Sequence, residues 1–255
     1  MSQFDKTLRS QFFLTGPRPC PYLPDRQERK LFTTLSGPNA SEVHDNLSAV
    51  GFRRSQNIAY RPACDGCNAC KSTRVRAFDF RMIRSQKRIA RRNRDVIVTT
   101  EDPWATEEQY ALFKRYVTHR HPGGGMSDMN AYDYAAMVEE SPVRSVIFEY
   151  RVADASGGTG ELIGACITDI LGDGLSLVYS FFDPDASKKR SIGNFIILDH
   201  IARAIQNRFP FVYLGYWVSG SDTMDYKINF SPIEILTKAG WQDQNIADQN
   251  ETGHA

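Results

Sequence analysis

Four cysteines in the first third of the chain have the side chains and the spacing to bind a metal. Cys64, Cys67 and Cys70 follow a C-x2-C-x2-C pattern, in which two intervening residues let neighbouring thiolates turn towards one centre. Cys20, in a second proline-bounded loop, is the candidate fourth ligand. We expect a structural zinc ion or iron–sulfur cluster here. Four reduced cysteines in a crowded pair of loops are the alternative.

The segment that follows the cysteines is strongly basic. The whole chain is almost neutral, with 31 basic and 30 acidic residues. The segment from Lys71 to Arg94 contains ten of the basic residues and a single acidic residue, Asp79. The rest of the chain therefore has 21 basic and 29 acidic residues. The near-neutral total therefore conceals a strong separation of charge.

Part of this basic segment has helical spacing. Arg81, Arg84, Arg88 and Arg91 lie three or four residues apart, so a helix over residues 85–94 would carry them as one stripe. A solvated basic face is the alternative, but so many cations without interleaved acids favour a phosphate backbone. The stripe contains no aromatic residue for stacking on bases, so we expect it to recognise backbone shape and charge.

A second basic cluster precedes an expected helix over residues 194–209. Basic side chains and free backbone N–H groups at a helix N-terminus form an anion site. The cluster partly matches the loop with which acetyltransferases hold the pyrophosphate of coenzyme A, but Phe195 replaces its last small residue. The ligand is either coenzyme A or phosphates at the 3′ end of a tRNA, and an ordinary basic helix cap is a third possibility. The residues are Lys188, Lys189, Arg190, Ser191 and Gly193.

These residues need a framework, which hydrophobic periodicity and turn residues predict. We expect an α+β protein with a small N-terminal α/β domain, residues 1–102, that contains the cysteine loop pair and the basic helix. Residues 103–255 would form a GNAT-like acyltransferase domain with a polar C-terminal tail. Its expected elements are helices over 106–121 and 129–140, three antiparallel strands over 145–152, 161–171 and 175–183, the helix over 194–209, and a parallel strand over 211–217.

Composition places the chain among globular proteins. With 255 residues and 41% hydrophobic residues, it is long enough for one large or two small cores. We find no apolar stretch of the length that crosses a bilayer and no N-terminal export signal. Together with cysteines that look unpaired, this predicts a cytoplasmic protein without a membrane partner.

Several sequence stretches resemble the aminoacyl-tRNA–protein transferase family. The similarity covers nearly the whole chain and is most specific in the last stretch, and it is greatest to the short bacterial branch. The stretches are CPYLPDRQERKLFTTL, YRPACDGCNAC, VYSFFDPD with KRSIG, and YLGYWVSGSDTMDYKINFSPIEIL.

The resemblance implies an activity. The bacterial branch transfers leucine from leucyl-tRNA to N-terminal Asp or Glu of acceptor proteins, which marks them for degradation through the N-end rule pathway. The eukaryotic branch transfers arginine, and its N-terminal cysteines are linked to metal or cluster binding. The partners would be charged tRNA and acceptor proteins, and the chemistry itself would need no cofactor because an aminoacyl-tRNA ester is already activated.

Roles for individual residues follow from this expectation. An arginine fork suits the acceptor carboxylate, and Arg74 and Arg76 are the candidates. The stripe and the second basic cluster would bind tRNA. Two other classes stay open, a coenzyme A-dependent N-acetyltransferase and a non-catalytic RNA-binding module, as do arginine as the donor and the oligomeric state. The residues that would line the acyl pocket and polarise the carbonyl are Tyr216, Trp217, Tyr226 and Lys227.

Overall fold

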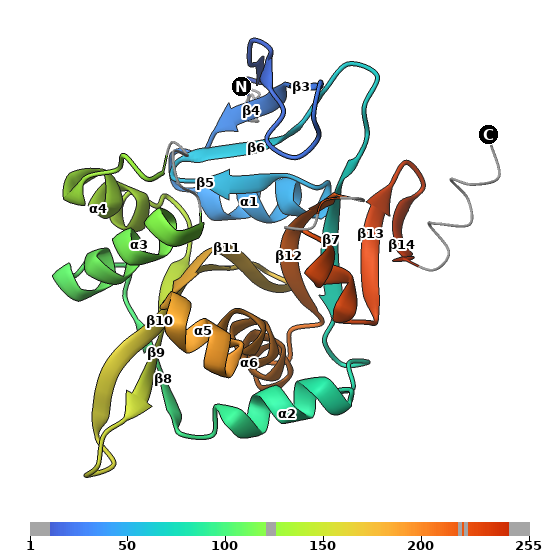
Figure 1. The fold of residues 1–255 in the computed structure, drawn as a ribbon. Coiled ribbons are helices and arrows are strands. Elements are labelled where there is room, and N and C mark those ends of the chain that lie inside the picture. Colours follow the sequence, from blue (N-terminus) through green and yellow to red (C-terminus); the bar gives the residue numbers. More distant parts are fainter. Residues whose placement is uncertain (1–10, 121–125, 219–220, 222–223, 245–255) are drawn as a thin grey trace, which may run out of the picture.

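A large sheet with helices on both faces and a smaller sheet at one end make up the protein (Figure 1). The computed structural model describes residues 11–120, 126–218, 221 and 224–244. Helices and strands are mixed along the chain, as expected. No helix in these ranges is long and apolar enough to cross a membrane.

The large sheet has eight strands in the order β14-β13-β7-β12-β11-β10-β9-β8. The β11–β12 pair is parallel, while every other pair between its described strands is antiparallel. The strands are β7 (Cys70–Arg76), β8 (Val96–Glu101), β9 (Ser145–Ala153), β10 (Thr159–Ile170), β11 (Gly174–Phe182), β12 (Phe211–Val218), β13 (Ile233–Thr237) and β14 (Gly240–Asp243).

The centre of this sheet confirms the predicted order of elements. β9, β10 and β11 form an antiparallel meander, α6 (Ile192–Gln206) follows, and β12 returns parallel to β11. Apolar residues occupy both faces of β10, which explains its nearly unbroken run of buried positions. A strand buried on both faces requires helices on both sides.

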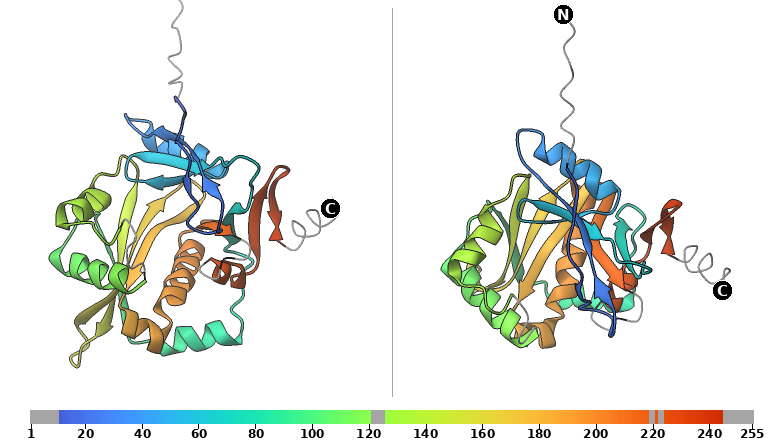
Figure 2. Two further views of the ribbon diagram at one scale, coloured as in Figure 1. Left: turned by 45° about the horizontal axis from the view of Figure 1, so that its top comes forward. Right: turned by 90° about the horizontal axis from the view of Figure 1, so that it is seen from above.

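Two hydrophobic cores lie on opposite faces of the sheet. One contains α6 and its neighbour α2 (Arg84–Arg92), packed against residues such as Val75 and Val212. The other contains α3 (Glu107–Arg120) and α4 (Ala131–Glu139), packed against residues such as Ile167 and Phe181. Figures 1 and 2 show these helices around the sheet, with the small sheet above it.

The small sheet has the strand order β1-β4-β6-β5 and is covered by α1 (Ala40–Ala49). Its own core contains Leu35, Phe52 and Ala59. The strands are β1 (Phe13–Leu14), β4 (Lys30–Thr34), β5 (Arg53–Ser55) and β6 (Ile58–Pro62), beside a two-stranded ribbon of β2 (Arg18–Pro19) and β3 (Gln27–Glu28).

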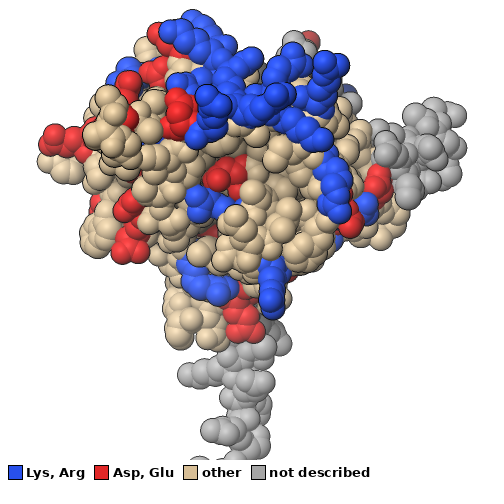
Figure 3. All heavy atoms as spheres, turned by 90° about the horizontal axis from the view of Figure 1, so that it is seen from below, with Lys and Arg blue, Asp and Glu red and all other residues tan. Residues whose placement is uncertain are grey.

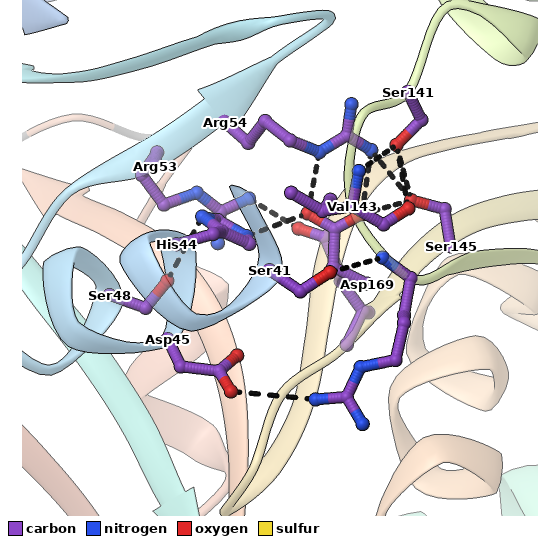
Figure 4. Close-up of polar contacts among 12 residues, drawn as sticks. Ser41, His44, Asp45, Ser48, Arg53, Arg54, Ser141, Val143, Ser145 and Asp169 are labelled. Atoms are coloured by element: carbon purple, nitrogen blue, oxygen red, sulfur yellow. Dashed lines mark hydrogen bonds and ion pairs between the residues drawn. The ribbon is translucent and has the colours of Figure 1, made fainter. Parts of the chain in front are cut away.

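A buried ionic network joins the small sheet to the large one (Figure 4). Asp169 of β10 accepts hydrogen bonds from Arg54 of β5, at 2.7 and 2.6 Å, and from Ser145 of β9 at 2.7 Å. His44 of α1 lies 2.9 Å from the same carboxylate. Burial alone would raise the pKa of Asp169, but the bonds from His44 and Arg54 outweigh it and lower the pKa to about 2.

The large sheet takes strands from both predicted domains. β7 and β8 precede residue 103, yet β7 lies between β12 and β13, and β8 forms one edge. Residues 1–102 and 103–255 are therefore joined by the sheet itself. Their division into separate folding units stays a prediction, and most of the predicted polar tail lies outside the described residues.

Candidate active site

The parallel pair at the centre of the sheet separates part-way along its length. β11 and β12 pair from Gly174–Phe211 to Ser176–Tyr213. On its other side β12 pairs with β7 along its whole length, from Phe211 to Val218, so it continues beside β7 after its pairing with β11 has ended. Backbone groups of the diverging strands consequently need other partners, and side chains supply two of them.

Arg53 of β5 reaches into the opening between these strands. Its Nη2 donates a hydrogen bond to the carbonyl oxygen of Leu177 in β11. On the β12 side its guanidinium lies over Gly215, which has φ +86° and where a Cβ would stand 2.9 Å from Arg53 Cζ. Only glycine leaves this space free without strain. Nη1 of Arg53 is buried and has no hydrogen-bond partner in the part of the chain that the structure describes.

Lys227 is the second side chain at the opening. It belongs to the short 3-10 helix η1 (Asp225–Asn229), is 6% exposed, and donates through Nζ to the carbonyl oxygen of Tyr216. Burial, followed by the nearby charge of Arg53, lowers the pKa of its amine to about 7. A lysine with such a pKa can accept a proton at neutral pH.

The predicted aromatic residues divide between this opening and another core. The hydroxyl of Tyr216 donates to the carbonyl oxygens of Gly51 and Tyr60, so it positions β12 against the small sheet. Tyr226 exposes 39% of its surface and lies at the border with solvent. Trp217 packs with Ile235 and donates to Asp225 at 3.2 Å. Trp217 therefore helps to hold η1 in place.

Three of the four arginines of the predicted stripe lie on α2. Arg84, Arg88 and Arg91 are exposed, as is Lys87, and none of these four forms an ion pair with a residue in the described part of the chain. Arg81 precedes α2 and donates to the carbonyl oxygens of Phe78 and Phe80. Figure 3 shows Lys and Arg gathered in a band over the face where α2 lies. This arrangement suits a polyanionic partner.

The second basic cluster differs from its expected geometry. Asp183 accepts hydrogen bonds from the N–H groups of residues 185 and 186, so 184–190 form a helix, α5 (Pro184–Arg190), where a turn was expected. Arg190 binds Asp95 through both terminal nitrogens, at 2.7 and 2.9 Å. A Cβ on Gly193 would stand 2.9 Å from the Phe182 ring. Gly193 thus provides packing space, while Lys188 stays exposed.

The two basic regions meet. Arg92 of α2 donates to the carbonyl oxygen of Lys189 at 3.0 Å, and Arg190 donates to that of Arg92 at 3.2 Å. Helix α2 and α5 therefore form one continuous basic surface beside α6.

Comparison with known proteins identifies the family. Residues 108–237 match the family model described as arginine-tRNA-protein transferase, C terminus, and residues 18–88 match the corresponding N-terminus model. This chain belongs to the arginine-tRNA-protein transferase family. The two matches leave residues 89–107 between them, around the predicted boundary.

Curated relatives within this transferase family are similar over most of their length. The chain is 55% identical to the aspartate/glutamate leucyltransferase of Sphingomonas elodea, over 91% of this chain and 89% of the relative. It is 51% identical to that of Phenylobacterium zucineum, over 94% and 93%. Among solved structures, L-PGS from Bacillus licheniformis aligns with a TM-score of 0.46 and 12% identity, over 64% of this chain and 52% of that one, a likeness too weak to carry an argument.

The arginines predicted to bind the acceptor pair with carboxylates of the transferase itself. Arg74 lies 2.7 Å from Glu234, and its guanidinium stacks between Phe211 and Trp241 at 3.5 and 4.3 Å from the ring centroids. Arg76 forms ion pairs with three carboxylates, those of Asp79, Glu234 and Asp243. Their role in acceptor binding stays a prediction. Because both arginines already pair with carboxylates of the protein, these contacts favour a different arginine for that role.

The four cysteines predicted as metal ligands are free thiols in this transferase. Burial, and then the neighbouring Cys20, Cys64 and Cys67, raises the pKa of Cys70 to about 11. The four thiols therefore lie near one another, and a metal site formed by them stays a prediction. Within the described ranges no three His, Cys, Asp or Glu side chains are placed to hold a metal ion.

The residue that sequence reasoning missed is Arg53. It stands in the short run GFRRSQ, 174 positions before Lys227, where nothing distinguishes it from Arg54. The pair of arginines does give one signal. Neighbouring residues of a strand face opposite sides, so two adjacent arginines on a short strand must have different surroundings. Arg54 faces Asp169 and Arg53 faces the opening between β11 and β12.

Proposed function

We propose that this chain is an aminoacyltransferase that moves leucine from leucyl-tRNA to the N-terminal Asp or Glu of acceptor proteins. The observation that carries this proposal is its identity of 51–55% to aspartate/glutamate leucyltransferases over about nine-tenths of both chains. The role fits the N-end rule pathway and a cytoplasmic enzyme. The order of β9 to β12 with α6 supports a GNAT-like acyltransferase core.

The reaction needs little beyond positioning and proton transfer. The neutral α-amine of the acceptor attacks the ester carbonyl carbon of leucyl-tRNA, so a C–N bond forms and the C–O bond to the terminal ribose breaks. The ester is already activated, and no cofactor takes part. The nitrogen loses one proton and the departing ribose oxygen gains one.

Lys227 is the residue best suited to move this proton. With a pKa of about 7 it is neutral in roughly half of the molecules at pH 7. It accepts the proton from the attacking nitrogen and returns it to the ribose oxygen. Tyr226, beside it in η1 at the border with solvent, lines the entrance for the leucyl group.

The basic surface of α2 and α5 would hold the tRNA. The exposed cations of α2 form no ion pair with a described residue, so phosphates can approach them without breaking one, and they displace condensed counterions from the nucleic acid. Helix α2 contacts α6, which also contacts α5, β10, β11 and β12. The surface therefore lies on the same side of the sheet as α6, from which the acylated 3′ end can extend towards the opening.

Turnover with defined donors tests the function. Purified protein is incubated with an Asp-initiated peptide and either leucyl-tRNA or arginyl-tRNA, and the product is measured by mass spectrometry. Addition of leucine is expected, and addition of arginine alone would establish the other donor. Acetylation from acetyl-coenzyme A without tRNA would indicate an N-acetyltransferase. Tight binding of charged tRNA without transfer to any peptide would indicate an RNA-binding module.

A further inference from the structure

Arg53 carries a charge for which the described part of the protein supplies no anion. Nη2 donates to the neutral carbonyl of Leu177, and Nη1 is buried without a hydrogen-bond partner among the described residues. No carboxylate within the described ranges forms an ion pair with it. The contrast with Arg54 is direct, because Arg54 donates through Nε and Nη2 to both carboxylate oxygens of Asp169. A buried cation is costly unless an anion compensates it.

The guanidinium of Arg53 packs directly over the backbone of Gly215. A Cβ on Gly215, which has φ +86°, would stand 2.9 to 3.2 Å from Arg53 Cζ, Nη1 and Nε. The hydroxyl of Tyr216, next in the chain, is hydrogen-bonded to the carbonyl oxygens of Gly51 and Tyr60. Neither residue therefore supplies a counter-charge to Arg53.

Arg53 also lies near the proposed proton acceptor, because its guanidinium packs over Gly215 and Lys227 Nζ donates to the carbonyl oxygen of the next residue, Tyr216. Its charge is the second cause of the lowered pKa of Lys227. In an acceptor, the side-chain carboxylate of the first residue and its reactive α-amine belong to the same amino acid. A group that holds the carboxylate must therefore lie close to the group that takes the proton from the amine, as Arg53 lies to Lys227.

We propose that Arg53 binds the side-chain carboxylate of the acceptor's first residue and so selects Asp and Glu, an inference that rests on the function proposed above. The other anion of the reaction is the oxyanion of the tetrahedral intermediate. It exists only during the chemical step and would leave Arg53 uncompensated in the bound state. A carboxylate compensates the charge as soon as the acceptor binds.

The amide analogues separate these two roles. Asn and Gln replace one acceptor oxygen by a donor and carry no charge, so Arg53 should reject them. For the parent enzyme we expect kcat/KM for an Asp-initiated peptide to exceed that for the Asn peptide by roughly 30- to 1000-fold. In Arg53→Gln this ratio should fall to within about threefold of unity. Arg53→Lys, with the charge but without the planar fork, should keep part of it.

A matched variant makes the result specific. Arg144→Gln, at an exposed arginine that pairs with Asp45, should keep the parent ratio. Retained tRNA binding shows that a variant is folded. If Arg53→Gln does not fold, the ratio of Arg53→Lys decides, and an unchanged ratio overturns the proposal. Equal losses for Asp and Asn peptides would assign Arg53 to the oxyanion and also overturn it.

Peptide binding without tRNA distinguishes this inference from the proposed function. Fluorescence titration of labelled Asp- and Asn-initiated peptides measures acceptor selection directly. If the parent prefers the Asp peptide, and Arg53→Gln does not, the inference holds whether or not leucine is transferred. If leucine is transferred and both proteins select Asp equally, the function stands and the assignment of Arg53 fails.

Discussion

Burial gives Lys227 a chemistry that its sequence position does not show. Its Nζ donates to the Tyr216 carbonyl, its side chain is 6% exposed, and Arg53 is close. Each of these disfavours the ammonium form or holds the amine in place. The sequence suggested that Lys227 polarises the carbonyl, whereas these features suit it better to proton transfer.

Replacing Lys227 tests that role. Lys227→Met should lower kcat by about 10²- to 10⁴-fold, because the proton acceptor is lost while the apolar stem is kept. In the parent, kcat should fall as pH drops through about 7, since the amine becomes protonated there, and this step should vanish in the variant. Lys238→Met, at an exposed lysine, is the control. A pH step that survives in Lys227→Met would show that another group titrates.

Between elements, Asp169 is the main polar link from β10 to α1 and β5. Asp169→Asn leaves Arg54 buried with a neutral partner, so the free energy of unfolding should fall by about 3–5 kcal/mol. Glu161→Gln, at an exposed position on the same strand, should change it by less than about 0.5 kcal/mol. Urea denaturation measures both, and a small loss for Asp169→Asn would mean that the network is not a stabilising link.

A second buried group, His200 of α6, should make this packing sensitive to acid. Its Nδ1 donates to the Ile196 carbonyl at 2.7 Å, its Nε2 accepts from Thr168 at 2.8 Å, and burial lowers its pKa to about 4. The unfolded chain, with a pKa near 6.5, binds the proton first. Stability is therefore complete above about pH 6.5 and decreases as pH falls towards about 4.

The size of this effect can be measured by comparing His200 with a residue that does not titrate. Between pH 7.5 and 5 the parent should lose about 2 kcal/mol from this group. His200→Gln should be less stable at pH 7.5, but its loss on acidification should be smaller by about that amount. Urea denaturation at each pH measures the free energy of unfolding. If it falls equally in parent and variant on acidification, the assignment to His200 is contradicted.

For the whole molecule, the separation of charge should govern tRNA binding. Replacing Arg84, Arg88 and Arg91 by Ala should reduce the slope of log Kd against log salt by about 2–3, because fewer counterions are released. Turnover at saturating tRNA should change less. A triple variant at exposed cations elsewhere, Arg18, Arg144 and Lys238, is the control. An unchanged slope for the α2 variant would place the tRNA on another face.

The sequence by itself determined the family, the order of elements from β9 to β12, and the basic stripe, because these depend on local periodicity and on contiguous motifs. It also located Lys227 near the site, since the run that contains it is specific. The predicted cysteine ligands and the acceptor arginines rested on spacing and charge alone, and spacing does not show which partners a side chain meets.

Only the tertiary structure decided which arginines pair with a carboxylate of the protein. Arg74 meets Glu234, 160 residues away, and Arg54 meets Asp169 across 115, whereas Arg53, one position earlier, meets no described carboxylate. All three look alike in the sequence. Their difference arises because the strand order brings distant segments together, and because burial makes the presence or absence of one counter-charge decisive.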